Sequence, residues 1–154
     1  MTYAEVTTKL NLAATVFCKP GTERVRALLA ALGHPERTLP VIHVTGTNGK
    51  GSTCAMLESV LRAAGYRTAF FTTPYLRSRC ESIRLCGVPL SRAAFARIGT
   101  EVLAAAEGMS DAPTEFELLT VMAFLAFAPC WAYSAFSRFC THRANVLPSF
   151  APFS

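Results

Sequence analysis

VIHVTGTNGKGS, residues 41–52, joins a short apolar run to a glycine-rich turn. Residues 41–44 are mostly β-branched, which is typical of a strand buried in a parallel sheet. Residues 53–64 have apolar side chains at helical spacing, and residues 68–71 form a second apolar run. A strand, a glycine loop, a helix and a second strand in this order predict parallel strands with a right-handed crossover. We therefore expect an α/β fold in which helices flank a parallel sheet that carries a phosphate loop (P-loop).

The glycine-rich turn has the chemistry of a phosphate-binding loop. A turn between a buried strand and a helix directs backbone N–H groups at one point, where the helix dipole also favours negative charge. Three glycines let the backbone approach a ligand closely, Lys50 can reach the outer phosphates, and Ser52 can contact phosphate or magnesium. The loop departs from the strict P-loop pattern, because Val44 replaces the first glycine and Gly51 precedes Ser52. The strand before it and the helix after it still favour nucleotide binding over an incidental glycine turn.

Further helices and a hairpin are expected from apolar spacing and end signals. Residues 22–32 have helical spacing and stop at Gly33, and Ser91 begins a helix that Gly108 ends. Apolar residues around Gly87 predict a short hairpin. The residues expected on the apolar faces of the helices are Val25, Leu28, Leu29, Leu32, Met56, Leu57, Val60, Leu61, Ala64, Phe95, Ile98, Val102 and Leu103.

The segment after residue 113 is apolar enough to raise the question of a membrane span. Residues 118–137 carry no charged side chain, and about 20 apolar residues can cross a bilayer. Thr114 and Glu117 nevertheless have the spacing of a capping box, which predicts a helix over residues 118–128 that Pro129 ends. We therefore expect a buried core helix in preference to a membrane-spanning one.

Composition and charge exclude several classes of protein. A chain of 154 residues with 51% hydrophobic residues has the size and composition of one folded domain and is not intrinsically disordered. Its net charge of +5 favours small anionic partners, but the basic residues form no run, so nucleic acid is not an expected partner. The six cysteines include no C-x-x-C pair, which argues against structural zinc. The first residues do not resemble a secretory leader, so we expect a cytoplasmic protein with reduced thiols.

Residues 41–52 resemble the phosphate loop of folylpolyglutamate synthases and dihydrofolate synthases, which belong to the Mur-ligase superfamily. Other segments keep the order and approximate spacing of the family's motifs: KPGTERV at 19–25, LG at 32–33, GYRT at 65–68, TTPYL at 72–76, ESIR at 81–84 and TEFE at 114–117. The resemblance covers roughly residues 1–128, and it implies the N-terminal part of a Mur-ligase-like ATP-binding domain.

The resemblance assigns roles to individual residues. It implies that the loop binds the phosphates of ATP, with Lys50 as the catalytic cation; the binding residues are Thr47, Asn48, Gly49, Lys50, Gly51 and Ser52. Thr73 stands where the family uses a hydroxyl as a magnesium ligand, and Ser52 is a second candidate ligand. The pterin side would consist of Lys19, Pro20, Gly21, Thr114, Phe116 and Glu117.

The implied reaction is the ATP-dependent formation of an amide bond. In this family the γ-phosphate activates a carboxylate of folate or dihydropteroate as an acyl phosphate, which the amino group of glutamate then attacks. Magnesium and Lys50 would offset the charge that develops during phosphoryl transfer. The implied partners are therefore ATP, folate or dihydropteroate, and L-glutamate. The family further implies a monomer in the cytoplasm, or in mitochondria.

Several of these residues have structural alternatives. Glu117 is favoured as the acceptor of its capping box over a direct substrate contact, and Phe116 can be a core residue. His43 lies in the expected strand, where we interpret it as a core histidine rather than a catalytic one. Cys54 and Cys86 are expected to be small buried residues. Three arginines either attract an anionic substrate or form a solvated basic face, namely Arg77, Arg79 and Arg84.

The sequence also departs from the family pattern. Tyr75 stands where many members have His, and Ser82 where many have Arg. Residues 129–154 contain no Asp or Glu and do not resemble the family's next strand and glycine motif, which carries a magnesium-binding glutamate. We therefore expect a family-like domain over 1–128 and a divergent tail over 129–154. A truncated, alternatively spliced or decayed product would be a nucleotide-binding fragment without ligase activity, and its cut sheet edge would lower its solubility.

Overall fold

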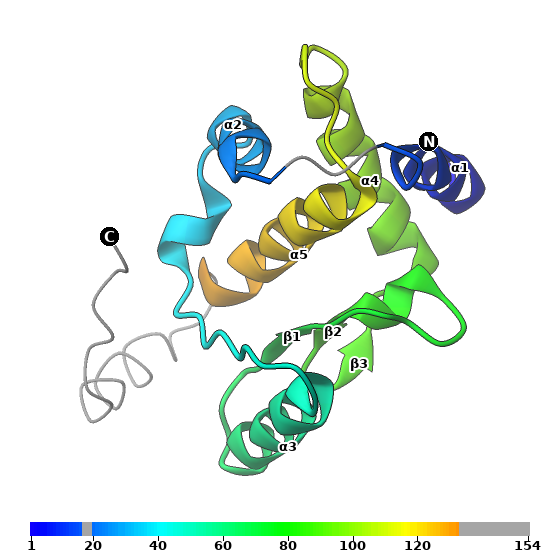
Figure 1. Cartoon of the computed structure of the whole chain (residues 1–154). Coiled ribbons are helices and arrows are strands. Elements are labelled where there is room, and N and C mark those ends of the chain that lie inside the picture. The colour runs from blue at the N-terminus through cyan, green and yellow to red at the C-terminus, as the bar shows by residue number, and fades with distance from the viewer. Residues whose placement is uncertain (17–19, 133–154) are drawn as a thin grey trace.

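The structure of the chain, a computed structural model, describes residues 1–16 and 20–132. A three-stranded sheet lies between a single helix on one side and a group of helices on the other (Figure 1). The described part is therefore an α/β structure in three layers. Lys19 and residues 133–154 of the expected tail lie outside the described residues.

The helical group is built around α5, Glu115–Ala132, which lies at its centre (Figure 1). The short 3-10 helix η1, Pro35–Thr38, also contacts α5. The helices expected after Thr22 and Ser91 are confirmed, and the Ser91 hydroxyl accepts a hydrogen bond from the Ala94 N–H as an N-cap. The other helices of this group are α1, Tyr3–Ala13, α2, Glu23–Ala31, and α4, Arg92–Ala106.

The core lies where α1, α2, α4 and α5 meet. α4 approaches its neighbours closely at Gly99, where an added Cβ would lie 2.5 Å from Cγ1 of Val6 and 3.2 Å from Cε of Met122. A side chain at this position would force α1 or α5 away from α4. The expected apolar face of α4 is buried as predicted, and the large, fully buried side chains around it include Phe95, Leu10, Leu28, Leu118 and Val102.

The sheet is antiparallel, which corrects the parallel sheet expected from the sequence. β1, Ala69–Phe71, pairs with β2, Ile83–Leu85, and β2 pairs with β3, Val88–Pro89. The hairpin expected around Gly87 is confirmed. Cys86 and Gly87 have φ angles of 49° and 80°, as in the two-residue turns that match the twist of paired strands.

Residues 41–44 do not form a strand, although their β-branched sequence predicts one. Val41 and Ile42 are 63% and 57% exposed. A strand needs a neighbour to pair with, and the strands of the described part pair only among themselves. The sequence pattern therefore identified a segment suited to a strand, but the described part of the chain supplies no partner that would make it one.

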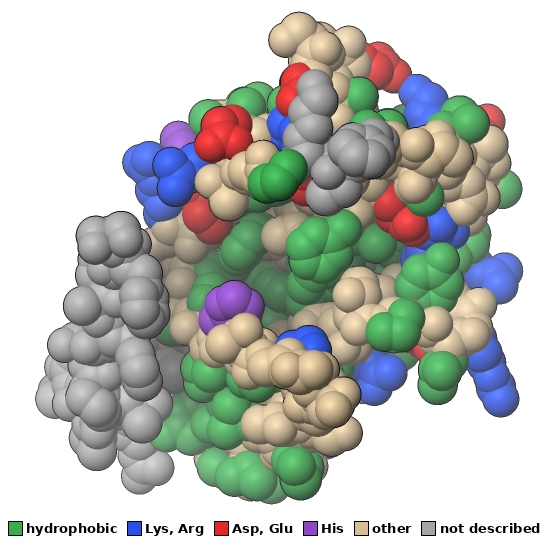
Figure 2. All heavy atoms as spheres, in the orientation of Figure 1, with side chains coloured by type: hydrophobic (Ala, Val, Ile, Leu, Met, Phe, Trp, Pro, Cys, Tyr) green, Lys and Arg blue, Asp and Glu red, His purple; other side chains and the backbone are tan. Residues whose placement is uncertain are grey.

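The single helix on the other face of the sheet is α3, Lys50–Ala63, which begins at Lys50 rather than at Thr53 as expected. It contacts β1, whose opposite side contacts α5 (Figure 1). Its expected apolar stripe is not buried by the described residues, since Met56 and Val60 are 64% and 66% exposed. Figure 2 shows hydrophobic side chains gathered over this part of the molecule and in the hollow between it and the helical group.

α5 begins with the expected capping box. The Glu117 N–H donates to the Thr114 hydroxyl at 3.3 Å, and the Thr114 N–H donates to the Glu117 carboxylate at 2.8 Å. The helix continues through Pro129 to Ala132, so the prediction that Pro129 ends it is wrong. A proline near a helix end removes one backbone hydrogen bond, and its fixed φ is compatible with the helix. Within the described residues, no helix is both long and apolar enough to cross a membrane.

Candidate functional site

The glycine loop ends where α3 begins, with Gly49 as the N-cap residue. Gly46 and Gly49 have φ angles of 147° and 78°, a region that residues with a Cβ rarely adopt. The first turn of α3 carries no acidic side chain, and no side chain caps its N–H groups. These open amides and the positive end of the helix dipole together favour an anion at this position.

Lys50 folds back over the glycine loop. Its ammonium group donates hydrogen bonds to the carbonyl oxygens of Gly46, at 2.6 Å, and Thr47, at 3.0 Å. The charge is therefore held beside the open amides of the first turn. All six residues expected to bind phosphate, 47–52, are exposed.

The expected magnesium ligands come from two neighbouring elements. A Cβ at Gly51 would lie 3.7 Å from the hydroxyl oxygen of Thr72, so the first turn of α3 borders the end of β1. Thr73 is the next residue along the chain and is exposed, as is Ser52 in the first turn of α3. Elsewhere in the described part of the chain, no three His, Cys, Asp or Glu side chains gather as a metal site would require.

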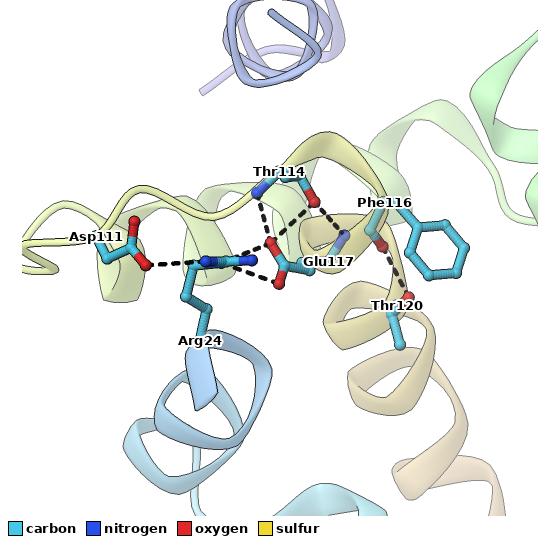
Figure 3. Close-up of polar contacts among 6 residues, drawn as sticks. All are labelled: Arg24, Asp111, Thr114, Phe116, Glu117 and Thr120. Carbon is cyan, nitrogen blue, oxygen red and sulfur yellow. Dashed lines mark hydrogen bonds and ion pairs between the residues drawn. The ribbon is translucent and has the colours of Figure 1, made fainter. Parts of the chain in front are cut away.

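Glu117 is the centre of a buried polar network (Figure 3). Both of its carboxylate oxygens accept a hydrogen bond from Nε of Arg24 at 3.0 Å, and one accepts the Thr114 hydroxyl at 2.9 Å. Nη1 of Arg24 also donates to the carboxylate of Asp111 at 2.8 Å. The network joins α2 to the start of α5 and to the loop before it.

The ionisation of this network follows from its contacts. Burial raises the pKa of Glu117, but the hydrogen bonds from Arg24 and from the backbone and hydroxyl of Thr114 outweigh burial and leave that pKa below its ordinary value. The hydrogen bonds to Glu117 and Asp111 raise the pKa of the Arg24 guanidinium. Glu117 is therefore charged and its carboxylate is already occupied; the capping-box contact with Thr114 was predicted, whereas the pairing with Arg24 was not.

Phe116 points away from Glu117, toward the other side of α5 (Figure 3). It is 58% exposed, so the alternative that it is a core residue is wrong. Its ring centroid lies 6.1 Å from that of Phe71, the last residue of β1. Because Thr72 and Thr73 follow Phe71, the exposed aromatic ring lies near the same end of β1 as the expected magnesium ligand Thr73, although α5 and α3 contact opposite faces of this strand.

The three arginines of the ESIR region and the loop before it have different environments. Arg79 is buried and donates from Nε to the Glu115 carboxylate at 2.7 Å and from Nη2 to the side-chain oxygen of Asn11 at 2.8 Å. Arg84 donates to the backbone of Glu81, and Arg77 is exposed. A common solvated basic face is therefore wrong for Arg79, which connects α5 to α1.

Three other residues differ from their expected burial. His43 is exposed, because residues 41–44 are not a covered strand, so the core interpretation of this histidine is wrong. Cys54 is partly buried and Cys86 is exposed in the hairpin turn, and both are free thiols, as is the buried Cys80. The hairpin places Cys86 at a turn position, which explains why a small apolar residue is not covered there.

The expected pterin-side residues are only partly brought together. Phe116 and Glu117 lie in the first turn of α5 and Thr114 directly precedes it, whereas Pro20 and Gly21 are exposed just before α2. The Arg24 and Glu117 contact joins the two helix starts. Sequence reasoning did not assign a role to Arg24, although it stands four residues before Leu28, and therefore on the buried face of α2.

Comparisons with known proteins agree on one group of enzymes, although no family model matches the chain. The dihydrofolate synthase/folylpolyglutamate synthase of Bacillus subtilis is 42% identical over 114 residues, which are 71% of this chain and 26% of that protein. Folylpolyglutamate synthase of Mycobacterium tuberculosis complexed with ADP is 34% identical with a TM-score of 0.76, over 83% of this chain and 30% of that one. E. coli FolC in complex with DHPP and ADP is 33% identical with a TM-score of 0.75, over 84% and 31%. The chain thus spans between a quarter and a third of the length of these relatives.

Proposed function

Because this chain belongs to the folylpolyglutamate synthase and dihydrofolate synthase family, we propose that it is the N-terminal, ATP-binding part of a ligase that adds glutamate to folate or dihydropteroate. The observation that carries the proposal is the exposed loop of residues 46–52, with its open amides and the Lys50 ammonium group. Two relatives of similar fold are complexed with ADP, which supports the same ligand here.

The state of Lys50 suggests how the loop accepts a nucleotide. Its ammonium group bonds to two neutral carbonyl oxygens. Charge-assisted hydrogen bonds to phosphate oxygens are stronger than bonds to neutral acceptors, so phosphate would draw the ammonium group off Gly46 and Thr47. The amides of Lys50, Gly51 and Ser52 would bind the same phosphates from the helix end. In phosphoryl transfer, Lys50 would offset the charge that develops on the transferred group.

The residues beside the loop fit a magnesium ion. Mg²⁺ prefers oxygen ligands, keeps several waters, and takes few ligands from the protein when it binds together with nucleotide phosphates. Thr73 and Ser52 offer hydroxyl oxygens from the two elements that meet at Gly51. When bound, the ion would neutralise phosphate oxygens and favour transfer of the γ-phosphate to the acceptor carboxylate.

The acceptor is proposed to bind on the α5 side of the loop. The exposed Phe116 ring offers a flat face on which an aromatic ring system such as a pterin can stack. Glu117 supports this surface from behind through Arg24 and Thr114 rather than by touching the substrate. Pro20 and Gly21 would border it from the start of α2, and Lys19 is proposed on the resemblance alone.

The glutamate-adding reaction is proposed for the full-length enzyme, because the relatives are much longer than this chain. We propose that residues 1–128 are the family-like domain and that residues 129–154 are a divergent tail. The second candidate, a nucleotide-binding fragment without ligase activity, is favoured by the exposed stripe on α3, because a complete domain would cover it. Both candidates require nucleotide binding, and they differ only in turnover.

Measurement of ADP release separates the two. The purified chain is given Mg-ATP, with folate or dihydropteroate, in the presence and absence of L-glutamate. Glutamate-dependent ADP release that is lost in Lys50→Ala would show that these 154 residues suffice for the ligase reaction. Nucleotide binding without such release supports the fragment, and the absence of nucleotide binding contradicts the proposal as a whole.

A further inference from the structure

Arg79 occupies an unusual position for a loop arginine. It lies in the short 3-10 helix η2, Arg79–Ser82, between the loop that follows β1 and strand β2, yet its side chain is only 9% exposed. Its guanidinium contacts three parts of the molecule that are far apart in sequence. These contacts involve Glu115, Asn11 and Tyr75.

On one side, Arg79 holds the first residue of α5. Nε lies 2.7 Å from Oε1 of Glu115, and Nη2 lies 2.6 Å from the same oxygen. Glu115 directly precedes Phe116, the exposed aromatic residue of this turn. A charge-assisted hydrogen bond from Nε and the ion-pair contact of Nη2 therefore hold the first residue of α5.

On the other side, Arg79 holds the loop that follows the expected magnesium ligand. The guanidinium carbon lies 5.3 Å from the centroid of the Tyr75 ring, within the range of a cation–π contact. Tyr75 stands two residues after Thr73. The carboxylate of Glu81 accepts the N–H groups of Leu76 and Arg77, so the loop beyond Tyr75 is already held in one conformation.

We propose that Arg79 is a positioning residue that makes the 72–78 loop and the first turn of α5 move as one unit. The coupling itself does not depend on the proposed function, but its effect on substrates rests on it. Under that function the loop carries the Thr73 hydroxyl of the nucleotide side, and the turn carries the Phe116 ring of the acceptor side. A displacement of one element is passed through Tyr75, Arg79 and Glu115 to the other. The spacing between nucleotide and acceptor is then set by one buried side chain.

Amide hydrogen exchange followed by NMR tests this coupling in the ligand-free chain. Arg79→Met keeps the length and apolar stem of the side chain and removes the guanidinium group. We expect exchange to rise about tenfold, both at the hydrogen-bonded amides of Thr72, Leu76 and Arg77 and at residues 117–120, because hydrogen bonds to charged groups have about that effect.

Residues 95–103 in the centre of α4 should be unchanged. Arg77→Met, a substitution of the exposed arginine in the same loop, should leave all three segments unchanged.

Two further variants keep the test decisive if Arg79→Met does not fold. Glu115→Gln removes the charge at the helix and should raise exchange in the 72–78 loop, although residue 115 is remote from it in sequence. Arg79→Lys retains the charge but not the planar fork, and should show an intermediate rise at both segments. A rise confined to one segment, or an equal rise across α4, would overturn the inference.

Addition of a non-hydrolysable ATP analogue with Mg²⁺ distinguishes this inference from the proposed function. In the wild-type chain the analogue should slow exchange at residues 50–53, and through Arg79 also at residues 117–120. If it slows neither segment, nucleotide binding fails while the coupling seen in the ligand-free chain still supports the positioning role. If it slows residues 117–120 equally in Arg79→Met, nucleotide binding stands and the positioning role of Arg79 is contradicted.

Discussion

Both carboxylate oxygens of Glu117 lie 3.0 Å from Nε of Arg24, so the acceptor of a helix capping box is also one half of a buried ion pair. The capping box is a local feature, whereas the ion pair joins α5 to α2, which is remote in sequence. One carboxylate therefore fixes both where α5 begins and where α2 lies against it. The pair holds the first turn of α5, which carries the exposed Phe116, against α2.

Glu117→Gln should destabilise the chain, because the amide cannot balance the charge of the Arg24 guanidinium. We expect the midpoint of thermal unfolding to fall by about 5 °C or more, followed by circular dichroism at pH 7. Glu107→Gln is the matched control, since Glu107 pairs with Lys9 at the surface, where such pairs contribute little. Equal shifts for the two variants would show that the buried pair has no special role.

The Arg24–Glu117 pair should make the free energy of unfolding depend on pH in the acid range. The pKa of Glu117 is lower in the folded chain than its ordinary value, so its charge stabilises the fold above that value. This stability is lost as the pH falls through the lowered, folded-state pKa. Urea unfolding at a series of pH values from neutral to acid should show a shallower loss of stability in Glu117→Gln than in the wild type. Parallel curves for the two chains would contradict the assignment.

Gly99→Ala tests the close approach of α4 to its neighbours. Alanine favours a helix over glycine by about 1 kcal/mol, so a helix without close neighbours would be stabilised. Here the added Cβ would lie 2.5 Å from Val6, and we expect a net loss of about 1–3 kcal/mol in the free energy of unfolding, measured with urea. Gly108→Ala is the control, because nothing lies within 4 Å of a Cβ there. Stabilisation by Gly99→Ala would show that the helices are less tightly packed than described.

Local patterns in the sequence predicted α2, α4, the capping box and the hairpin correctly, whereas α1 was not predicted and the start of α3 and the end of α5 were placed wrongly. Thr114 and Glu117 act within one turn, and Cys86 and Gly87 within one hairpin. These features depend only on residues that are close in sequence, so the sequence alone can predict them. The direction of the sheet could not be read in this way. Residues 41–44 have the composition of a buried strand, but pairing depends on a partner elsewhere in the chain, and the described part offers none.

In the candidate site, too, only the part that is continuous in the sequence could be identified from it. The glycine loop of residues 46–52 is a continuous motif, and the structure places Gly51 near Thr72, the neighbour of Thr73; the binding roles of these residues stay predictions. The two buried arginines were harder to find, because a charged residue acquires a structural role only through its partner. The position of Arg24 on the apolar face of α2 indicates that this arginine is buried. Its pairing with Glu117, however, depends on how α2 packs on α5.

The exposed stripe of α3 should make the chain self-associate. Met56 and Val60 lie one turn apart and are 64% and 66% exposed. Val60→Lys should reduce the apparent mass at high protein concentration, measured by light scattering after size-exclusion chromatography, because a charge within the stripe opposes apolar contact between copies. Ala55→Lys adds the same charge off the stripe and should have a smaller effect. If both variants behave as the wild type does, the stripe is not the contact surface.

A calorimetric titration of the chain with a non-hydrolysable ATP analogue and Mg²⁺ tests the central claim most directly, with Lys50→Ala and Lys9→Ala as paired variants. Lys50 donates hydrogen bonds to carbonyl oxygens of the glycine loop, whereas Lys9 pairs with Glu107 on the surface. We predict saturable binding at one site, weakened about tenfold or more in Lys50→Ala and unchanged in Lys9→Ala. Absence of binding by the wild-type chain, or equal affinity in Lys50→Ala, would contradict the assignment of residues 46–52 as a nucleotide site.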